Sequence, residues 1–214
     1  MNDLNTRISN CRHCPRLVKW REEVALTKKR EYRDWDYWGK AVPSFGDPQA
    51  RVLIVGLAPG AHGANRTGRM FTGDSSGKWL YRALHKAGYA NQPTWERRDD
   101  GLKLSDCYIT AACHCAPPGN KPLPAEIANC NRYLKAELQQ MRPRLIIVLG
   151  KIAFDTYLKT RGVKPLPEFA HNRLYDFDPP VLASYHPSRQ NTNTGKLTEP
   201  MLDAVFAQAR KLLR

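Results

Sequence analysis

The sequence predicts an α/β fold in which helices cover a largely parallel sheet. Four short apolar runs have the composition of buried strands, and helical patterns lie between them. Strands that alternate with helices are typical of parallel sheets, because each helix carries the chain back across the sheet. The chain has 214 residues, of which 42% are hydrophobic. It is therefore expected to bury one core as a single domain over residues 1–214.

The first predicted elements follow a polar lead-in. Residues 1–50 are basic and rich in tryptophan, and they show no clear periodicity. Residues 51–58 (RVLIVGLA) form a β-branched apolar run that ends before Pro-Gly, which is typical of a buried parallel strand. Residues 76–87 place their apolar side chains on one helical face, and Gly88 ends this predicted helix.

The second half of the chain repeats the alternation. Residues 107–113 (CYITAAC) predict a second strand. Residues 124–141 predict a helix that opens with proline in its first turn and ends before Pro143. The remaining predicted elements are a third strand over 144–150, a helix through about residue 159, a fourth strand over 180–185 and a last helix over 197–213.

The charge of the chain indicates a polyanionic partner. Thirty-four Lys and Arg residues against 20 Asp and Glu give a net charge of +14. Nucleic acid is the favoured partner, because neutralising its phosphates releases counterions. No apolar run approaches the about 20 residues that span a bilayer, and the N-terminus is too polar for a signal peptide. We therefore expect a cytoplasmic, nucleoid-associated protein that binds no membrane.

Four cysteines form two pairs that lie a hundred residues apart, Cys11 with Cys14 and Cys115 with Cys130. Disulfides are disfavoured inside cells, and four thiolates are typical ligands of tetrahedral zinc or of an iron–sulfur cluster. Either group would join the N-terminus to the loop that the second pair flanks. The spacing alone does not distinguish the two.

Glycine-rich or polar segments follow three of the predicted strands. They cover residues 58–63, 117–122 and 186–188. Because ligands of open α/β sheets bind beyond the carboxyl ends of the strands, we expect these segments to converge on one site. The first segment lacks the Gly-Lys-Ser/Thr ending of a phosphate loop, which argues against nucleoside triphosphate binding.

Four side chains near these strand ends are candidates for chemistry. Phe71 lies among small and polar residues, where a ring has no obvious core role, and is expected to stack on a base. His186, whose backbone is restricted by the following proline, suits an electrophile or acid that faces negative charge. Asn120 is either a turn residue or a ligand of a water or a base edge. Asp74 either caps the helix that follows it or lies in the site.

Three segments in this order, together with the four cysteines, resemble the family 5 uracil-DNA glycosylases: GLAPGAHGANRTGRMFTGDSSG, PPGNKPLP and HPSRQNTNTG. The resemblance covers roughly residues 10–210. It implies a three-layer α/β/α sandwich around a four-stranded, mainly parallel sheet. It also implies a [4Fe-4S] cluster on Cys11, Cys14, Cys115 and Cys130, with zinc as the alternative. Cys107 and Cys113 fall outside this ligand pattern and are expected to be buried thiols.

The resemblance further implies a role for individual residues. His186 matches the histidine that stabilises charge on uracil O2 as the base leaves, and Asn120 matches the asparagine that holds the hydrolytic water, here aided by Asp74. The residues that match the base pocket are Gly56, Ala58, Pro59, Gly60 and Phe71, whose ring stacks on the flipped base. The loop that enters the minor groove of DNA corresponds to residues 188–195, and it opens with Ser188, Arg189, Gln190 and Asn191.

Two segments depart from the patterns of related families. Ala58 and Ala61 lie where families 1 to 4 have a polar residue that activates water. Ala111 and Ala112 lie where family 4 has an asparagine that reads the uracil edge. Both departures are typical of family 5, and they argue against strong general-base catalysis and strict selectivity for uracil.

The expected activity is that of a monofunctional glycosylase in base excision repair. Such an enzyme excises uracil, and other deaminated or damaged bases, from DNA and leaves an abasic site. We expect a monomer, with a sliding clamp as a candidate protein partner. A non-catalytic, metal-bound nucleic-acid binding domain is one alternative, but it leaves Phe71 and His186 without a purpose. An enzyme of free nucleotides is another, but it leaves the net charge unexplained.

Overall fold

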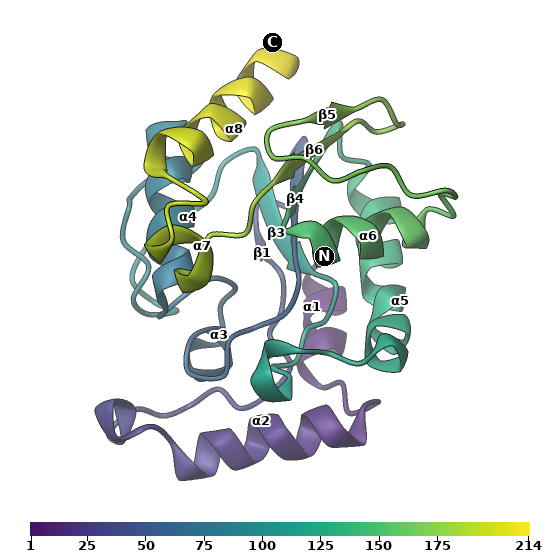
Figure 1. Ribbon diagram of the computed structural model, residues 1–214. Helices are drawn as coiled ribbons and strands as arrows, with labels where there is room; N and C mark the ends of the chain where they lie inside the picture. The colour runs from purple at the N-terminus through teal and green to yellow at the C-terminus, as the bar shows by residue number, and fades with distance from the viewer.

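A computed structural model describes all 214 residues. It contains eight α-helices, two short 3-10 helices and one mixed sheet of six strands (Figure 1). In chain order the elements are α1 (Asn2–Ser9), α2 (Pro15–Thr27), η1 (Arg30–Tyr32), β1 (Phe45–Gly46), β2 (Val52–Gly56), α3 (Ala64–Thr67), α4 (Ser75–Lys86), β3 (Cys107–Ala111), η2 (Pro118–Asn120), α5 (Pro124–Met141), β4 (Leu145–Leu149), α6 (Lys151–Thr160), β5 (Leu174–Tyr175), β6 (Val181–Ser184), α7 (Arg189–Asn193) and α8 (Glu199–Leu212).

The strand order of the sheet is β1-β3-β2-β4-β6-β5. The four inner strands are parallel, and they are the four strands that the sequence predicts. The expected number of strands is wrong, because β1 and β5 add antiparallel edges and make six. Each edge strand is only two residues long, which is too short to leave an apolar pattern in the sequence.

Helices cover both faces of the sheet, so the expected α/β/α sandwich is confirmed (Figure 1). α4 and α8 pack on one face, and α5 and α6 pack on the other. Every residue of β2, β3, β4 and β6 is buried. This burial on both faces explains why the strands are continuous apolar runs instead of alternating patterns.

The N-terminal 50 residues contain two helices that the sequence pattern did not reveal. α1 buries Leu4 and Ile8, and α2 buries Leu17 among its apolar residues. These side chains form a third apolar cluster with Cys113, Cys115 and Cys130. α2 packs against α3, and in Figure 1 it runs below α3 across the bottom of the view. The apolar face of each helix is narrow, and charged residues surround it in the sequence.

The segment 188–195 was expected to be a long loop, and this is wrong in part. Residues Arg189–Asn193 form the short helix α7, which begins after Ser188 because the serine Oγ accepts a hydrogen bond from Asn191 N. The helix is polar throughout, so no apolar face marked it in the sequence.

None of the helices is long and apolar enough to cross a membrane.

One carboxyl group lies inside the core beside the sheet. Glu137, on α5, is fully buried, and its Oε1 accepts a hydrogen bond from Ser44 Oγ. Its Oε2 has no hydrogen-bond partner. Burial raises the pKa of Glu137 to about 7, because a carboxylate loses hydration in the core.

This burial predicts how stability changes with pH. The unfolded chain loses the Glu137 proton near its ordinary pKa of about 4.3, whereas the folded protein keeps it until about pH 7. The contribution of Glu137 to the free energy of unfolding therefore falls as pH rises between these two values and stays low above them. Glu137→Gln removes this loss, so the variant gains stability relative to the parent between about pH 5 and about pH 8.

Urea denaturation at about pH 5 and at about pH 8 measures the difference in the free energy of unfolding between Glu137→Gln and the parent. Glu126→Gln is the matched control on the same helix, because the ion pair with Arg16 lowers the pKa of Glu126 against the effect of its burial. Because the carboxyl of Glu126 is already ionised in both states above about pH 5, the stability difference between this control and the parent is expected not to change between about pH 5 and about pH 8. A difference between Glu137→Gln and the parent that does not change with pH contradicts the assignment.

Candidate active site

The end of β4 is the point where two other segments of the chain meet. β4 lies between β2 and β6 in the sheet, and the chain leaves it through Gly150, whose φ is +95°. A Cβ atom at Gly150 would lie 3.1 Å from Cβ of His186, two residues beyond β6. Glycine at this position therefore permits both the left-handed backbone and the close approach of His186.

Phe71 reaches the same place from the loop that follows β2. Its ring lies against Gly56, where an added Cβ would be 3.1 Å from the ring carbons. The centroids of the Phe71 and His186 rings are 5.8 Å apart, and their planes are inclined by 32°. The φ of Phe71 is +51°, which is unusual for a bulky side chain. The structure thus brings together Gly56, Phe71 and His186 at the carboxyl edge of the sheet.

His186 is a neutral group at neutral pH. Burial lowers the pKa of its imidazole to about 4, because the charged form loses hydration. A neutral imidazole offers one donor and one acceptor nitrogen. The carbonyl oxygen of His186 accepts a hydrogen bond of 2.8 Å from Asn191 Nδ2, which fixes the backbone of the histidine to α7.

Asp74 caps α4 and also faces the loop that follows β2. Its Oδ1 accepts hydrogen bonds from Ser76 N and Gly77 N, at 3.0 and 3.2 Å, and so caps α4. Its Oδ2 faces the loop after β2, where an added Cβ would lie 3.0 Å away at Gly60 and 2.3 Å away at Gly63. Burial raises the pKa of Asp74 against the effect of its two backbone hydrogen bonds.

Two other residues of the expected base pocket, Ala58 and Pro59, belong to this loop. Pro59 is buried, and Ala58 is half-buried against the apolar cluster that contains the cysteines. Leu57 O accepts a hydrogen bond from Cys113 N, which extends the pairing of β2 and β3 beyond their ends. The loop that begins at Ala58 therefore lies between the sheet and the cysteines.

Asn120 is held by a different part of the structure. It is exposed at the end of η2, with a φ of +57°. Its loop is tied to α2, because Arg16 Nη2 donates a hydrogen bond to Lys121 O at 3.3 Å. No hydrogen bond links Asn120 to Asp74 or His186. The expected convergence therefore holds for the segments after β2 and β6, and the hydrogen bonds do not extend it to the segment after β3.

The start of the 188–195 segment docks beside Asp74. Arg189 Nε donates a hydrogen bond to Ser75 Oγ at 3.2 Å, which joins α7 to the first residue of α4. The side chains of Arg189 and Gln190 are nevertheless exposed. The segment thus presents polar side chains to solvent next to the Phe71–His186 pair.

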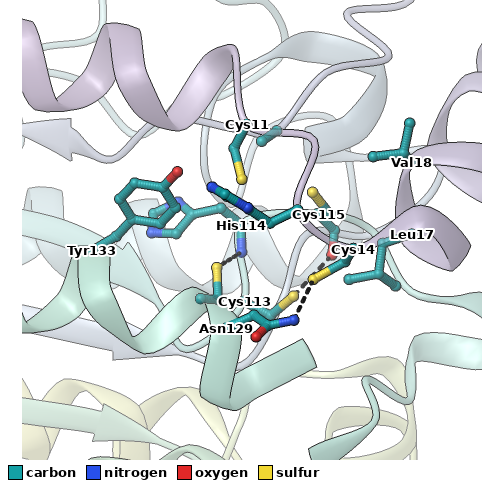
Figure 2. Close-up of a pocket in the computed structure, with 12 residues that line it drawn as sticks. Cys11, Cys14, Leu17, Val18, Cys113, His114, Cys115, Asn129 and Tyr133 are labelled. Atoms are coloured by element: carbon teal, nitrogen blue, oxygen red, sulfur yellow. Dashed lines mark hydrogen bonds between the residues drawn. The ribbon is translucent and has the colours of Figure 1, made fainter. Parts of the chain in front are cut away.

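Five cysteines line one small pocket, shown in Figure 2. Four of them are the expected ligands, and the fifth is Cys113, which the sequence pattern set aside as a buried thiol. Cys113 is indeed buried, and so is Cys107, which lies in the apolar cluster with residues of α4 and α8. No three His, Cys, Asp or Glu side chains have the geometry of a metal site. The thiols therefore gather around one pocket without being arranged as a set of ligands. The lining cysteines are Cys11, Cys14, Cys113, Cys115 and Cys130.

Hydrogen-bond donors point at three of the sulfur atoms. Arg21 Nη1 lies 2.9 Å from Cys115 Sγ, and two weaker donors, His114 N and Asn129 Nδ2, contact Cys130 and Cys14 at 3.2 and 3.7 Å. Arg21 is only 1% exposed and forms no ion pair, since its neighbour Glu22 pairs with Arg12. Burial raises the pKa of the Cys115 thiol to about 12, against the effect of the Arg21 cation, which favours the thiolate.

Sequence reasoning missed Arg66, which holds the loop after β2 in place. Its guanidinium lies 3.8 Å from the ring centroid of Tyr32 and 4.0 Å from that of Trp35. Arg66 also donates hydrogen bonds of 2.8 Å to the carbonyl oxygens of His62 and Gly73. The only sequence signal was the run of Trp and Tyr in the lead-in, and nothing there names the arginine with which those rings pair.

The fold and the site together define a class of protein. A basic α/β/α sandwich that places an aromatic ring and a neutral histidine at the carboxyl edge of its parallel strands suits an enzyme that acts on the bases of nucleic acid. The sequence profile described as "Uracil DNA glycosylase superfamily" matches residues 43–210. The chain belongs to this superfamily and, within it, to the type-5 uracil-DNA glycosylases.

Similar proteins cover nearly the whole chain. A type-5 uracil-DNA glycosylase of Mycobacterium tuberculosis (strain CDC 1551 / Oshkosh) is 50% identical over 98% of this chain and 81% of that protein. The type-5 uracil-DNA glycosylase of Thermus thermophilus is 49% identical over 96% of this chain and 94% of that protein. The type-5 uracil-DNA glycosylase of Pyrobaculum aerophilum is 46% identical over 97% of this chain and 91% of that protein. The resemblance to family 5 is confirmed.

Proposed function

We propose that this chain is a monofunctional DNA glycosylase that flips uracil, and other deaminated or damaged bases, out of DNA and hydrolyses the N-glycosidic bond. The product is an abasic site in the DNA. The observation that carries the proposal is the Phe71–His186 pair at the edge of the sheet, in a chain of net charge +14. The names of the type-5 relatives support the same reaction.

Bond cleavage depends on stabilising the base as it leaves. The C1′–N bond breaks toward an oxocarbenium-like sugar, and the bonding electron pair leaves with the base. Neutral His186 donates a hydrogen bond to uracil O2, where negative charge develops, and one such donor contributes about 3 kcal/mol. The low pKa of His186 means that it acts through this hydrogen bond and not by transferring a proton. The ring of Phe71 stacks on the flipped base.

Water then captures the sugar cation and must lose a proton. The carboxylate of Asp74 accepts that proton, because its Oδ2 faces the loop between Gly60 and Gly63 and is not used in capping α4. Asn120 orients the water, as the resemblance implies; a neutral amide cannot take the proton. The hydrogen bonds of the Asn120 loop, which join it to α2, give this second assignment no further support.

The pocket selects its base mainly by shape. The resemblance assigns its walls to the backbone of Gly56 and Gly60 and to the small residues Ala58 and Pro59. Ala111 and Ala112 at the end of β3 are buried and carry no polar group that reads a base edge. A site without such groups discriminates weakly between bases of similar shape. We therefore propose that deaminated or damaged bases other than uracil are also excised.

The DNA is held by the segment after His186. Ser188, Arg189, Gln190 and Asn191 begin the part that enters the minor groove and fills the space left by the flipped base. The exposure of Arg189 and Gln190, and the bond from Arg189 to α4, support this assignment. The monomeric state, the nucleoid-associated location and a sliding clamp as partner stay predictions.

We further propose a [4Fe-4S] cluster on Cys11, Cys14, Cys115 and Cys130, with zinc as the alternative. The residues fit such a group, because Arg21 is a buried cation without a carboxylate partner and its Nε lacks any acceptor. A metal centre with four thiolate ligands is anionic and supplies the missing counter-charge. When bound, the centre provides a structural cross-link between the N-terminus and the loop of Asn120.

The first experiment incubates the protein with a uracil-containing duplex and measures abasic sites by alkaline cleavage. The parent protein is expected to produce them. His186→Ala is expected to lower the excision rate more than about tenfold, because the leaving base loses its hydrogen bond, while duplex binding persists. His85→Ala, on the exposed face of α4, is the control and keeps the parent rate. Absence of abasic sites contradicts the proposed function, and unchanged excision by His186→Ala removes this residue from the mechanism.

Asp74→Asn separates capping from water activation. An amide oxygen still caps α4, so the melting temperature stays close to that of the parent. The amide cannot accept a proton, so excision slows. In the parent, the rate rises with pH as the carboxyl of Asp74 ionises through its raised pKa, and this rise is absent in the variant. A pH–rate profile of Asp74→Asn that matches the parent rules out the assignment.

Cysteine substitutions test the ligand set. Alanine at Cys11, Cys14, Cys115 or Cys130 is expected to abolish metal retention, whereas Cys113→Ala, in the same pocket, is expected to keep it. Iron and zinc per chain, together with the visible spectrum after anaerobic purification, measure the outcome. Brown protein with iron identifies the cluster, and colourless protein with stoichiometric zinc identifies the alternative. Loss of metal in Cys113→Ala would show that the ligand set is wrong.

A further inference from the structure

Arg21 contacts the cysteine pocket with its side chain. The residue lies on α2 and is 1% exposed. Its Nη1 donates to Cys115 Sγ at 2.9 Å, and its Nη2 donates to Cys11 O at 3.0 Å. One guanidinium therefore joins a cysteine from each of the two pairs that are separated by a hundred residues of sequence.

The main chain of Arg21 contacts the loop after β2. Its carbonyl oxygen accepts a hydrogen bond of 3.2 Å from Asn65 Nδ2. Asn65 lies on α3 and is fully buried, and its Nδ2 is also 3.4 Å from Ala61 O. The backbone N–H of Asn65 donates to Gly60 O at 3.0 Å. Arg21 and Asn65 thus form a continuous path from the cysteines to the loop that faces Asp74.

The charge of Arg21 needs an anion that the protein side chains do not otherwise supply. A guanidinium stays protonated in proteins, and burying it is costly unless a negative group pairs with it. No carboxylate pairs with Arg21, and Nε has no acceptor. The nearest acidic residue in the sequence, Glu22, pairs with Arg12 at the surface. The sulfur of Cys115 is the only titratable group to which Arg21 donates.

We propose that Arg21 is the counter-cation of the cysteine-bound metal centre and the residue through which that centre holds α3 and the 58–63 loop in place. Arg21 is a positioning residue, because it acts on the site through Asn65. The inference rests on the proposed metal centre and the proposed glycosylase function. It assigns separate tasks to two groups of one residue: the guanidinium retains the metal, and the carbonyl oxygen holds the loop.

The first test measures metal retention in the anaerobically purified full chain. Iron or zinc released to a colorimetric chelator is followed over time, together with the visible spectrum. Arg21→Met keeps the length of the side chain but removes the charge and the hydrogen bond to Cys115, and it is expected to release metal more than tenfold faster than the parent. Arg21→Lys restores the charge and is expected to recover part of this loss. Arg12→Met, which replaces an exposed arginine of the same N-terminal segment, is the control and is expected to release metal at the parent rate.

Two results of this test overturn the counter-cation role. One is release from Arg21→Met at the parent rate. The other is equally fast release from Arg21→Lys and Arg21→Met, because packing alone, and not charge, would then explain the effect. Circular dichroism of Arg21→Lys, which retains a long cationic side chain, shows whether the comparison is made on folded protein. None of these readouts depends on base excision, so they stand even if the proposed function fails.

The second test separates the loop from the metal. Asn65→Ala removes the contact with the Arg21 carbonyl and leaves the guanidinium in place. This variant is expected to retain metal like the parent, while amide hydrogen exchange in residues 58–67 becomes faster and kcat for uracil excision falls. In Arg21→Met, exchange becomes faster both in this loop and in residues 113–116. Unchanged exchange over residues 58–67 in Asn65→Ala contradicts the coupling. If exchange in this variant becomes faster but the parent protein excises no uracil, only the proposed function is overturned.

Discussion

The close approach of His186 to Gly150 is the contact on which the site depends. β4 separates β2 from β6 in the sheet, so the segments that follow those two strands meet only if nothing projects from the end of β4. Gly150 meets this requirement with a φ of +95° and no side chain. Phe71 then completes the pair from the other side, in a backbone conformation that costs free energy and that the surrounding contacts must maintain. The chemistry follows from this geometry, because a neutral histidine beside an aromatic ring provides a hydrogen bond and a stacking surface for a planar base.

The N-terminal segment holds this geometry from outside the sheet. Arg66 joins His62 to Gly73 within the segment after β2 and is enclosed by rings of the lead-in, while Asn65 beside it connects the same segment to α2. The aromatic residues of the lead-in, which suggest nucleic-acid binding when read from the sequence, are largely packed within the protein, whereas most of its basic residues are exposed. Trp35 lies between Arg66 and Arg97, at 4.0 and 4.7 Å from their guanidinium carbons. These rings therefore stabilise the loop, and fewer of them are available to contact DNA.

The sequence predicted the inner sheet well because its signals are local. α5 begins and ends at the predicted residues, since Pro124 opens it and Pro143 follows it. The two edge strands and the short helices α1 and α7 were missed because each is too short, or too polar, to show a period. In the site, Phe71 and His186 were predicted from their places after the strands. Cys113, Arg21 and Arg66 were not, because their importance comes from partners that are distant in sequence and that only the folded chain brings near.

The central claim is that a flipped base binds at the Phe71–His186 pair and is stabilised there as it leaves. A crystal structure of the protein with a duplex that carries a non-hydrolysable uracil nucleotide tests this claim most directly. The account predicts that uracil lies outside the helical stack, with its ring against Phe71 and its O2 within hydrogen-bond distance, about 3 Å, of His186. A uracil that stays stacked in the duplex, or that binds with O2 turned away from His186, would contradict the account.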